Sequence, residues 1–187
     1  MLSPYEKCPI FENENYQLRL VETSDAADLF LVYSDEEAVP YFNSDNCNGD
    51  TFHYTLIEHM QGAIKAWLQE YNQKGFVRWT IIDKRIQHAV GTIELFRRIA
   101  TDYFNNCGIL RLDLRSDYEQ EHIIYEILSL IVPQAKELFD CQMIATKVKS
   151  FATERKAAIE RLRFVASQEK LIGGHDHKIY ADYFVLH

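Results

Sequence analysis

Glu94 and Asp113 interrupt otherwise apolar stretches of the sequence, and each is a candidate proton acceptor. Glu94 lies within Val90–Leu95, and Asp113 lies within Ile109–Leu114. A carboxylate on a strand can act as a general base when it faces a cleft that admits the reacting group. A solvated strand carboxylate is the more common explanation for either residue, so the elements around them decide between the two.

The segment from residue 108 to residue 139 predicts a strand, a tight turn and a buried helix. Ile109–Leu114 is apolar apart from Arg111 and Asp113, which is typical of a strand, and Ser116–Tyr118 predicts the turn. The helix has apolar residues at steps of three or four, namely Ile124, Ile127, Ile131, Ala135 and Leu138. Because the first N–H groups of a helix are unpaired, this unit is suited to binding an anionic group.

The other elements alternate along the chain in a way that predicts one α/β sheet with helices on both faces. The expected order is strand, two helices, three strands, helix, strand, helix and two strands, in a single domain over residues 1–187 with residues 1–15 as an extended lead-in. Residues 39–50 form an irregular loop that we expect to make a lip over a site. The expected strands are 16–21, 76–83, 89–98, 107–114, 143–149, 164–168 and 179–186, and the expected helices are 26–32, 52–74, 123–139 and 153–162.

Composition excludes several classes of function. The chain of 187 residues has a formal net charge of -8, which argues against a nucleic-acid surface rich in Lys and Arg. Apolar stretches are too short to span a membrane, and the N-terminal residues lack the apolar core of a signal peptide. Cys8, Cys47, Cys107 and Cys141 are too widely spaced for a metal site or a disulfide framework. These features predict a cytoplasmic protein with reduced cysteines.

Two other constellations have a chemical interpretation and a simpler one. His175 and His177 are two residues apart, so they would share one side of a strand as metal ligands, but a third ligand is not evident and a solvated turn is expected. Aromatic residues also lie near a run of acids, which could form a pocket for an amine, although core packing explains them equally well. The aromatic residues are Tyr41, Phe42, Phe52 and Tyr54, and the acids are Asp35, Glu36 and Glu37.

The order of elements, with the residues in them, resembles the GNAT acyltransferase superfamily over nearly the whole chain. Tyr16–Phe30 resembles the opening strand and helix of the branch that includes the ribosomal-protein alanine N-acetyltransferases. Val90–Ile93 resembles its third strand, Leu114–Tyr118 the approach to its acetyl-CoA loop, and Ala157–Phe164 its late helix. The resemblance implies a mixed, mostly antiparallel twisted sheet of about six or seven strands.

The resemblance also implies acetyl-CoA as cofactor and a set of residues around it. The family loop reads Gln/Arg-x-x-Gly-x-Gly/Ala, and here Glu119 takes the first place, His122 the first glycine and Ile124 the second small residue, so no glycine remains. Family members often carry Ser where Arg155 stands. The implied cofactor-binding residues are Leu112, Leu114, Glu119, Gln120, Glu121, His122, Ile123, Ile124 and Arg155, with the strand residues supplying backbone groups to the thioester.

Glu119 and Glu121 leave two interpretations of this loop open. A carboxylate about 5 Å from a phosphate costs roughly 3 kcal/mol at an effective dielectric constant of about 20, and Arg155 could offset part of that cost. Alternatively, the two carboxylates cap the helix themselves and occupy the place of the phosphate. The second interpretation is slightly favoured.

Two functions follow from the resemblance. The first is transfer of an acetyl group from acetyl-CoA to a primary amine of a small molecule or a protein N-terminus, with Glu94 or Asp113 as base and Tyr125 or Tyr180 as acid. The second is a catalytically inactive module of the same fold that has lost acetyl-CoA binding and acts by interaction. Neither involves a metal, a nucleic acid or a membrane.

Overall fold

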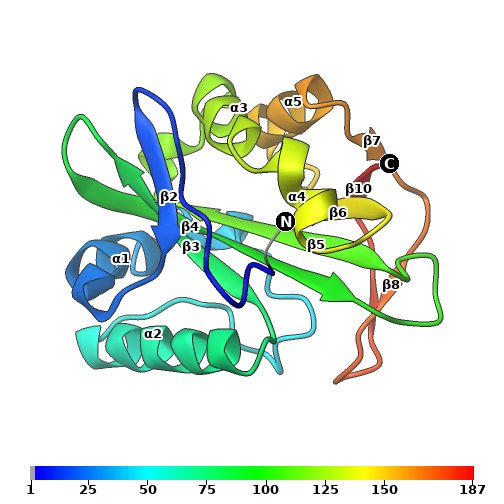
Figure 1. Ribbon diagram of the computed structural model, residues 1–187, viewed down its shortest axis with the longest axis horizontal. Coiled ribbons are helices and arrows are strands. Elements are labelled where there is room, and N and C mark those ends of the chain that lie inside the picture. The colour runs from blue at the N-terminus through cyan, green and yellow to red at the C-terminus, as the bar shows by residue number, and fades with distance from the viewer. Residues whose placement is uncertain (1–2) are drawn as a thin grey trace.

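A twisted sheet organises the molecule in the computed structural model, which describes residues 3–187 (Figure 1). Across these residues eight strands follow the order β1-β2-β3-β4-β5-β6-β10-β7, and β8 and β9 form a separate pair. Only β5 and β6 run parallel, so the predicted mostly antiparallel sheet is confirmed, with more strands than predicted. The strands are β1 (Phe11–Glu12), β2 (Tyr16–Leu20), β3 (Val77–Asp83), β4 (His88–Arg98), β5 (Cys107–Leu114), β6 (Met143–Lys147), β7 (Val165–Ala166), β8 (Leu171–Ile172), β9 (Ile179–Tyr180) and β10 (Tyr183–Leu186).

Helices cover both faces of the sheet, as predicted. Two lie on one face and three on the other, where α3 and α5 are neighbours (Figure 1). The first pair is α1 (Ala26–Tyr33) and α2 (Ile57–Asn72), and the second group is α3 (Glu121–Ser129), α4 (Val132–Leu138) and α5 (Thr153–Arg161). No helix within residues 3–187 has the length and apolar character needed to cross a bilayer.

The central strands alternate between an apolar face and a buried polar face. Trp79, Ile93 and Leu112 belong to the main core cluster, which the residues of α3, α4 and α5 complete. The intervening residues of the same strands are buried but polar, and they face α1 and α2: Arg78, Thr92, Glu94 and Asp113. Side chains alternate strictly along a strand, so the apolar pattern of one face fixes a polar layer on the other.

The predicted helix over 123–139 is broken in two, which corrects one expectation. Pro133 lies in the first turn of α4, and proline has no N–H to continue a helix. The N–H groups of Leu130 and Ile131 bond to carbonyls three residues earlier, which closes α3 with a tighter turn. The apolar stripe still faces the core on both sides of the break, because Ile124, Ile127 and Ala135 are buried.

Two further boundaries differ from prediction for backbone reasons. The helix expected over 52–74 begins at Ile57, because Phe52 has a φ of 61° and its N–H bonds to the Asp50 side chain at 2.7 Å. The strand expected over 179–186 divides at Asp182, whose φ is 67°. The part before Asp182 pairs with β8, and the part after it pairs with β6 and β7.

Candidate active site

The pairing between strands β5 and β6 ends halfway along β5. They pair from Cys107 with Met143 to Leu110 with Thr146, and pairing stops there. Arg111–Leu114 remain bonded to β4 on one edge only. An unpaired strand edge offers N–H and C=O groups to an extended ligand, so this gap is a candidate cleft beside the strand residues that the resemblance assigns to the thioester.

The side chain of Arg155, from α5, fills this cleft. Its Nη1 donates to the carbonyl oxygens of Leu112 at 2.8 Å and Tyr41 at 3.1 Å. Its Nε donates to one carboxylate oxygen of Glu119 at 3.2 Å, and its Nη2 donates to the other. Arg155 is only 4% exposed and Glu119 only 9%, so the pair is closed off from solvent. A bidentate pair of this kind is a strong, directional contact.

The N-terminus of α3 is also occupied by a side chain of α5. The N–H of Glu121, the first residue of α3, donates to Oε2 of Glu154 at 2.9 Å. The carboxylate of Glu121 instead lies 3.5 Å from Nη1 of Arg161. The expectation that Glu119 and Glu121 would cap this helix is therefore wrong, because Glu119 is bound to Arg155 and the capping carboxylate comes from Glu154.

The predicted cofactor-binding residues divide into three groups. Leu112, Glu119 and Arg155 meet in the cleft through the contacts above. Gln120 and His122 are exposed, and Glu121 and Ile123 are partly exposed at the start of α3. The side chains of Leu114 and Ile124 are buried in the core, so only their backbone groups remain available to a ligand.

As the structure arranges them, the backbone groups that would hold acetyl-CoA are already bonded to side chains of α5. The amide-bearing arm of acetyl-CoA would need the Leu112 carbonyl, and its pyrophosphate would need the first N–H of α3. Both groups are already bonded to α5, and no glycine between Glu119 and Ile124 allows closer approach of the backbone. The strand edge and the helix N-terminus offer backbone groups that could bind the cofactor, but Arg155 and Glu154 already occupy them.

The opposite face of β5 carries a buried polar network that spans three neighbouring strands. Arg78 on β3 is directly opposite Glu94 on β4, and Glu94 is directly opposite Arg111 on β5. Arg78 Nη2 and Arg111 Nη1 donate to different oxygens of Glu94, the latter at 2.9 Å. Glu94 is therefore shared by two guanidinium groups, and the cross-strand register alone brings the three together.

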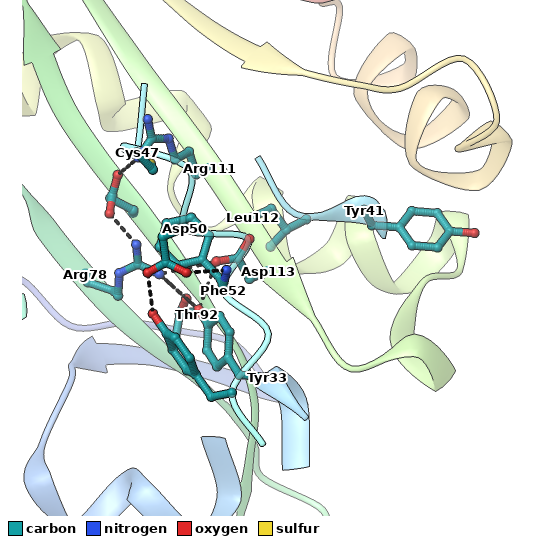
Figure 2. A network of polar contacts seen from close by, with 12 residues as sticks. Tyr33, Tyr41, Cys47, Asp50, Phe52, Arg78, Thr92, Arg111, Leu112 and Asp113 are labelled. Atoms are coloured by element: carbon teal, nitrogen blue, oxygen red, sulfur yellow. Dashed lines mark hydrogen bonds and ion pairs between the residues drawn. The ribbon is translucent and has the colours of Figure 1, made fainter. Parts of the chain in front are cut away.

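A second carboxylate completes this network one residue further along. Tyr33 of α1 donates its hydroxyl to Asp113 Oδ2 at 2.8 Å and lies 2.7 Å from Thr92 Oγ1. Arg78 Nη1 donates to the same Tyr33 oxygen at 2.9 Å. Figure 2 shows these groups converging, with Tyr41 apart from them beyond β5. The guanidinium of Arg78 also stacks 4.1 Å from the ring centroid of Trp67.

The two predicted bases differ in how readily they hold a proton. Burial opposes ionisation of Glu94, but the charges of Arg78 and Arg111 outweigh it, so the pKa of Glu94 is lowered. Burial raises the pKa of Asp113, although Arg78 and the Tyr33 hydroxyl act against it. A carboxylate held by two arginines is a weak proton acceptor, which makes Glu94 better suited to positioning those arginines.

A cavity of about 440 Å³ opens above this network, and Arg78, Glu94 and Arg111 form its floor. Its walls are aromatic and its rim is polar, with exposed carboxylates at Asp50 and Glu70. The cavity is large enough for a small amine or for one end of a peptide. The remaining residues that line it are Asn46, Cys47, Phe52, Ala66, Trp67, Gly75, Phe76, Phe96 and His175.

The predicted lip, residues 39–50, lies along the edge of both the cleft and the cavity. Beside the cleft, the Pro40 carbonyl accepts a bond from Lys149 Nζ at 2.7 Å. In its middle, Asp45 lies 2.7 Å from Lys147 Nζ and accepts a bond from the Tyr183 hydroxyl at 3.1 Å. Beyond Asp45, the lip lines the cavity through Asn46, Cys47 and Asp50, so it lies where a lip over this candidate site is expected.

The other predicted constellations lie as follows. Of the aromatic and acidic residues expected to form an amine pocket, only Phe52 lines the cavity, and Asp35 instead accepts the N–H of Ser116 at 2.9 Å. His175 lines the cavity rim from the turn between β8 and β9. Tyr180 donates to Asp176 at 2.5 Å, and the ring of Tyr125 stacks on Arg161, so neither faces the cavity floor.

Sequence reasoning missed the two arginines of the cavity floor and three of its aromatic walls. Arg78 and Arg111 each stand within an apolar strand, and a charge in such a place is a signal because an unpaired one is almost never buried. Glu94 is a buried negative charge on β4, the strand that lies between those of Arg78 and Arg111. The aromatic walls Trp67, Phe76 and Phe96 carry no such signal, since core packing predicts the same residues.

Comparison with known proteins identifies the fold independently. Residues 16–165 match the family model described as an acetyltransferase (GNAT) domain. Among curated proteins, no sequence matches this chain. A ribosomal-protein-S5-alanine acetyltransferase from Vibrio fischeri superposes with a TM-score of 0.68 at 16% identity, covering 95% of this chain and 94% of that chain.

Two further solved structures show the same likeness. A ribosomal L7/L12 alpha-N-protein acetyltransferase in complex with coenzyme A has a TM-score of 0.70 at 11% identity, covering 95% of this chain and 97% of that chain. An acetyl transferase from Salmonella typhimurium that modifies the N-terminal serine of ribosomal protein L7/L12 has a TM-score of 0.66 at 13% identity, covering 95% and 98%. At these identities the likeness is one of fold.

Proposed function

The chain belongs to the acetyltransferase (GNAT) domain family, and on this premise we propose that it transfers an acetyl group from acetyl-CoA to a primary amine. The observation that carries the proposal is the position of β5 between two compartments. The Leu112 carbonyl faces the cleft, while the side chain of the preceding residue, Arg111, lines the cavity. A donor in the cleft and an acceptor in the cavity would therefore meet at adjacent residues of one strand.

The charges of the cavity favour a cationic acceptor with an apolar body. Arg78 and Arg111 exceed the single charge of Glu94 by one in the floor, and the exposed carboxylates of Asp50 and Glu70 at the rim bring the lining to a formal net charge of -1 with His175 neutral. Acidic groups at the mouth of a cavity attract an ammonium ion, and aromatic walls bind both its charge and its apolar part. We therefore place the acceptor amine of a small molecule or peptide here, beside an aromatic or aliphatic group.

The acceptor must lose a proton before it can attack a thioester. Glu94 lines the cavity but both of its oxygens are held by arginines, and Asp113 is not among the lining residues. We propose that these two carboxylates position Arg78 and Arg111, and that His175 on the rim accepts the proton. An imidazole nitrogen can accept a proton from an attacking amine, which is the role of a general base.

The cysteines support a reducing compartment for this activity. Cys8, Cys47, Cys107 and Cys141 are all free thiols in the structure. Burial raises the pKa of Cys107 to about 12, and burial raises the pKa of Cys47 as well. Thiols that stay protonated react slowly, so we assign Cys47 and Cys107 no nucleophilic role. Unpaired cysteines are usual in the reducing cytoplasm, where we propose that the protein acts.

Thiol release from acetyl-CoA tests the proposed function. The full chain is incubated with acetyl-CoA and phenethylamine, with spermidine, or with a short peptide that has a free N-terminus, and each product is checked by mass for one added acetyl group. We expect the fastest turnover with an amine next to an apolar group, and we expect Asp50→Asn to raise KM for it. No acetylated product from any amine, at millimolar acetyl-CoA, contradicts the proposal.

A non-catalytic module of this fold is the second candidate, and one observation favours it. The two backbone groups that would anchor a cofactor are bonded to Glu154 and Arg155. The loop over residues 119–124 contains no glycine. This candidate predicts that acetyl-CoA produces no thermal shift in the wild-type chain or in variants with a freed cleft. A ligand at 100 times its Kd should add about 2.7 kcal/mol to the free energy of unfolding, which a thermal shift detects.

A further inference from the structure

Two consecutive residues of α5 occupy the two anchor points that a cofactor would use. Glu154 places a carboxylate on the first N–H of α3, and Arg155 places a guanidinium on the unpaired carbonyl of Leu112. The two contacts are on opposite sides of the short segment between β5 and α3, and one helix supplies both. Helices α3 and α5 pack side by side, which brings both side chains of α5 to these groups (Figure 1).

The Glu154 carboxylate takes the place suited to a phosphate. An acid at a helix N-terminus is attracted by the same unpaired N–H groups and the same partial positive charge as a bound anion. Glu154 is an exposed residue, and its carboxylate caps α3 rather than its own helix, whose N-cap residue Ala152 provides no side-chain bond. Nothing else holds this carboxylate among the described residues, so it can swing into solvent when a stronger anion arrives.

The Arg155 guanidinium takes the place suited to an amide-bearing arm. Its N–H groups satisfy the Leu112 carbonyl as the N–H of an added strand would. Unlike Glu154, it is buried and is bound on three sides, by Leu112, by Tyr41 and by Glu119. If the Arg155 side chain leaves the cleft, the Glu119 carboxylate must find another partner or reach solvent, because it would otherwise remain as a buried unpaired charge.

We propose that α5 is a built-in competitor for acetyl-CoA: Glu154 and Arg155 imitate the anionic and amide groups of the cofactor, and acetyl-CoA binds only when both side chains are displaced. The proposal rests on the proposed function, since it concerns the donor cleft of that reaction. It predicts a low affinity for acetyl-CoA in the wild-type chain and a gain of affinity when either imitation is removed.

The first test removes the carboxylate at the helix N-terminus. Isothermal titration of acetyl-CoA into the full chain is compared for wild type, Glu154→Ala and Glu160→Ala. Glu160 is a matched control, because it is an exposed acid of the same helix and pairs only loosely with Lys156, at 3.8 Å. We expect Glu154→Ala to bind at least about tenfold more tightly than wild type, with the gain shrinking at high salt, and Glu160→Ala to bind as wild type does.

The second test empties the cleft without leaving a buried charge. The double variant Arg155→Ala, Glu119→Gln removes both members of the ion pair, and circular dichroism verifies that it folds. We expect acetyl-CoA to bind it at least about tenfold more tightly than wild type, and the gain to add to that of Glu154→Ala, because the two groups contact different parts of the cofactor.

Three results would overturn the proposal that α5 competes with acetyl-CoA. Equal affinity in wild type and all variants, or weaker affinity in the variants, shows that Glu154 and Arg155 do not exclude the cofactor. In either case amine acetylation by the wild-type chain leaves the proposed function standing. Absence of binding in every variant overturns the competitor as well, and if no amine is then acetylated by any variant, the proposed function fails separately.

Discussion

Two arginine clusters flank β5, and they use the same chemistry to opposite effect. On the face toward α1 and α2, Arg78 and Arg111 share Glu94, and the cluster forms the floor of an open cavity. On the other side, Arg155 pairs with Glu119 and fills the gap in which β5 and β6 separate. Both clusters are charge-assisted and shielded from solvent, but Arg78 Nε and Arg111 Nε in the cavity cluster have no hydrogen-bond partner among the described residues.

The difference lies in which elements supply the charges. The members of the cavity cluster are direct neighbours on adjacent strands, so the sheet register holds them whether or not a ligand is present. The members of the cleft cluster come from α5 and from the segment before α3, which meet only through packing. A cluster built within a sheet is a fixed surface, whereas a cluster built between a helix and a strand edge can be displaced. Substitutions made in one cluster at a time test whether the cavity cluster is fixed and the cleft cluster is displaceable.

Glu94→Gln should produce the largest loss of stability, because two buried guanidinium groups lose the charge that they share. We expect the free energy of unfolding to fall by about 4 kcal/mol, as for breaking a buried ion pair. Urea denaturation monitored by tryptophan fluorescence measures it. Asp140→Asn is the control, since Asp140 pairs with Arg97 on the surface and should change stability by less than about 1 kcal/mol. Equal losses in the two variants would contradict a preorganised floor.

Arg155→Met should cost somewhat less, about 3 kcal/mol, by leaving Glu119 buried without its partner. The double variant Arg155→Met, Glu119→Leu should recover part of this loss, because it removes the unpaired charge, although the carbonyls of Leu112 and Tyr41 still lack the donor that Arg155 supplied. Urea denaturation of Arg155→Met, Glu119→Leu and the double variant gives the coupling between the residues. If the double variant is less stable than Arg155→Met, the pair is structural and cannot be displaced without unfolding the cleft.

The two carboxyls of the cavity cluster should respond to pH in opposite directions. The pKa of Glu94 is lowered from its ordinary value of 4.5, so its stabilising contribution is present above pH 4.5 and is lost as pH falls. The pKa of Asp113 is raised from 3.8, so its ionisation costs stability as pH rises through that value. Relative to wild type, Glu94→Gln should therefore lose stability with rising pH, and Asp113→Asn should gain it. Denaturant midpoints of wild type and both variants, measured from pH 3 to pH 7, test this prediction. The same pH dependence in both variants would contradict the opposite pKa shifts of Glu94 and Asp113.

Arg163→Gly should produce the smallest change and should leave both clusters intact. Arg163 follows α5 with a φ of 71°, a left-handed conformation that glycine adopts without strain. We expect the variant to gain about 0.5 to 1 kcal/mol of stability, after the entropy of the unfolded chain is counted. Ala157→Gly, at an exposed position inside α5, should instead lose about 1 kcal/mol. A loss in both variants would show that the Arg163 side chain makes a contact that matters more than its backbone.

Hydrophobic pattern predicted most of the fold because each central strand has one apolar face. Cys107–Leu114 was predicted with its observed bounds, since apolar residues alternate there around Arg111 and Asp113. The pattern could not locate the break before Pro133 or the late start of the helix at Ile57. Both depend on a local backbone event, a missing N–H in one case and the left-handed Phe52 in the other, while the apolar stripe continues across them.

The candidate site was predicted in its parts and missed in its arrangement. Leu112, Glu119 and Arg155 were all expected at a cofactor, and the structure brings them together. That Arg155 would bond to Leu112 depends on how α5 packs against α3, which no local pattern encodes. The cavity floor was missed for the same reason, because Arg78 and Glu94 are far apart in the sequence and become neighbours only through the strand register.

The lip carries a consequence for kinetics. Its Tyr41 carbonyl is held by Arg155 in the donor cleft, and a few residues later Asn46, Cys47 and Asp50 line the acceptor cavity. A donor that expels Arg155 would also release the Tyr41 carbonyl, and we expect this change to reach the amine cavity through the lip. Steady-state turnover should then follow a compulsory sequence, with the nucleotide bound before the amine and a ternary complex between them.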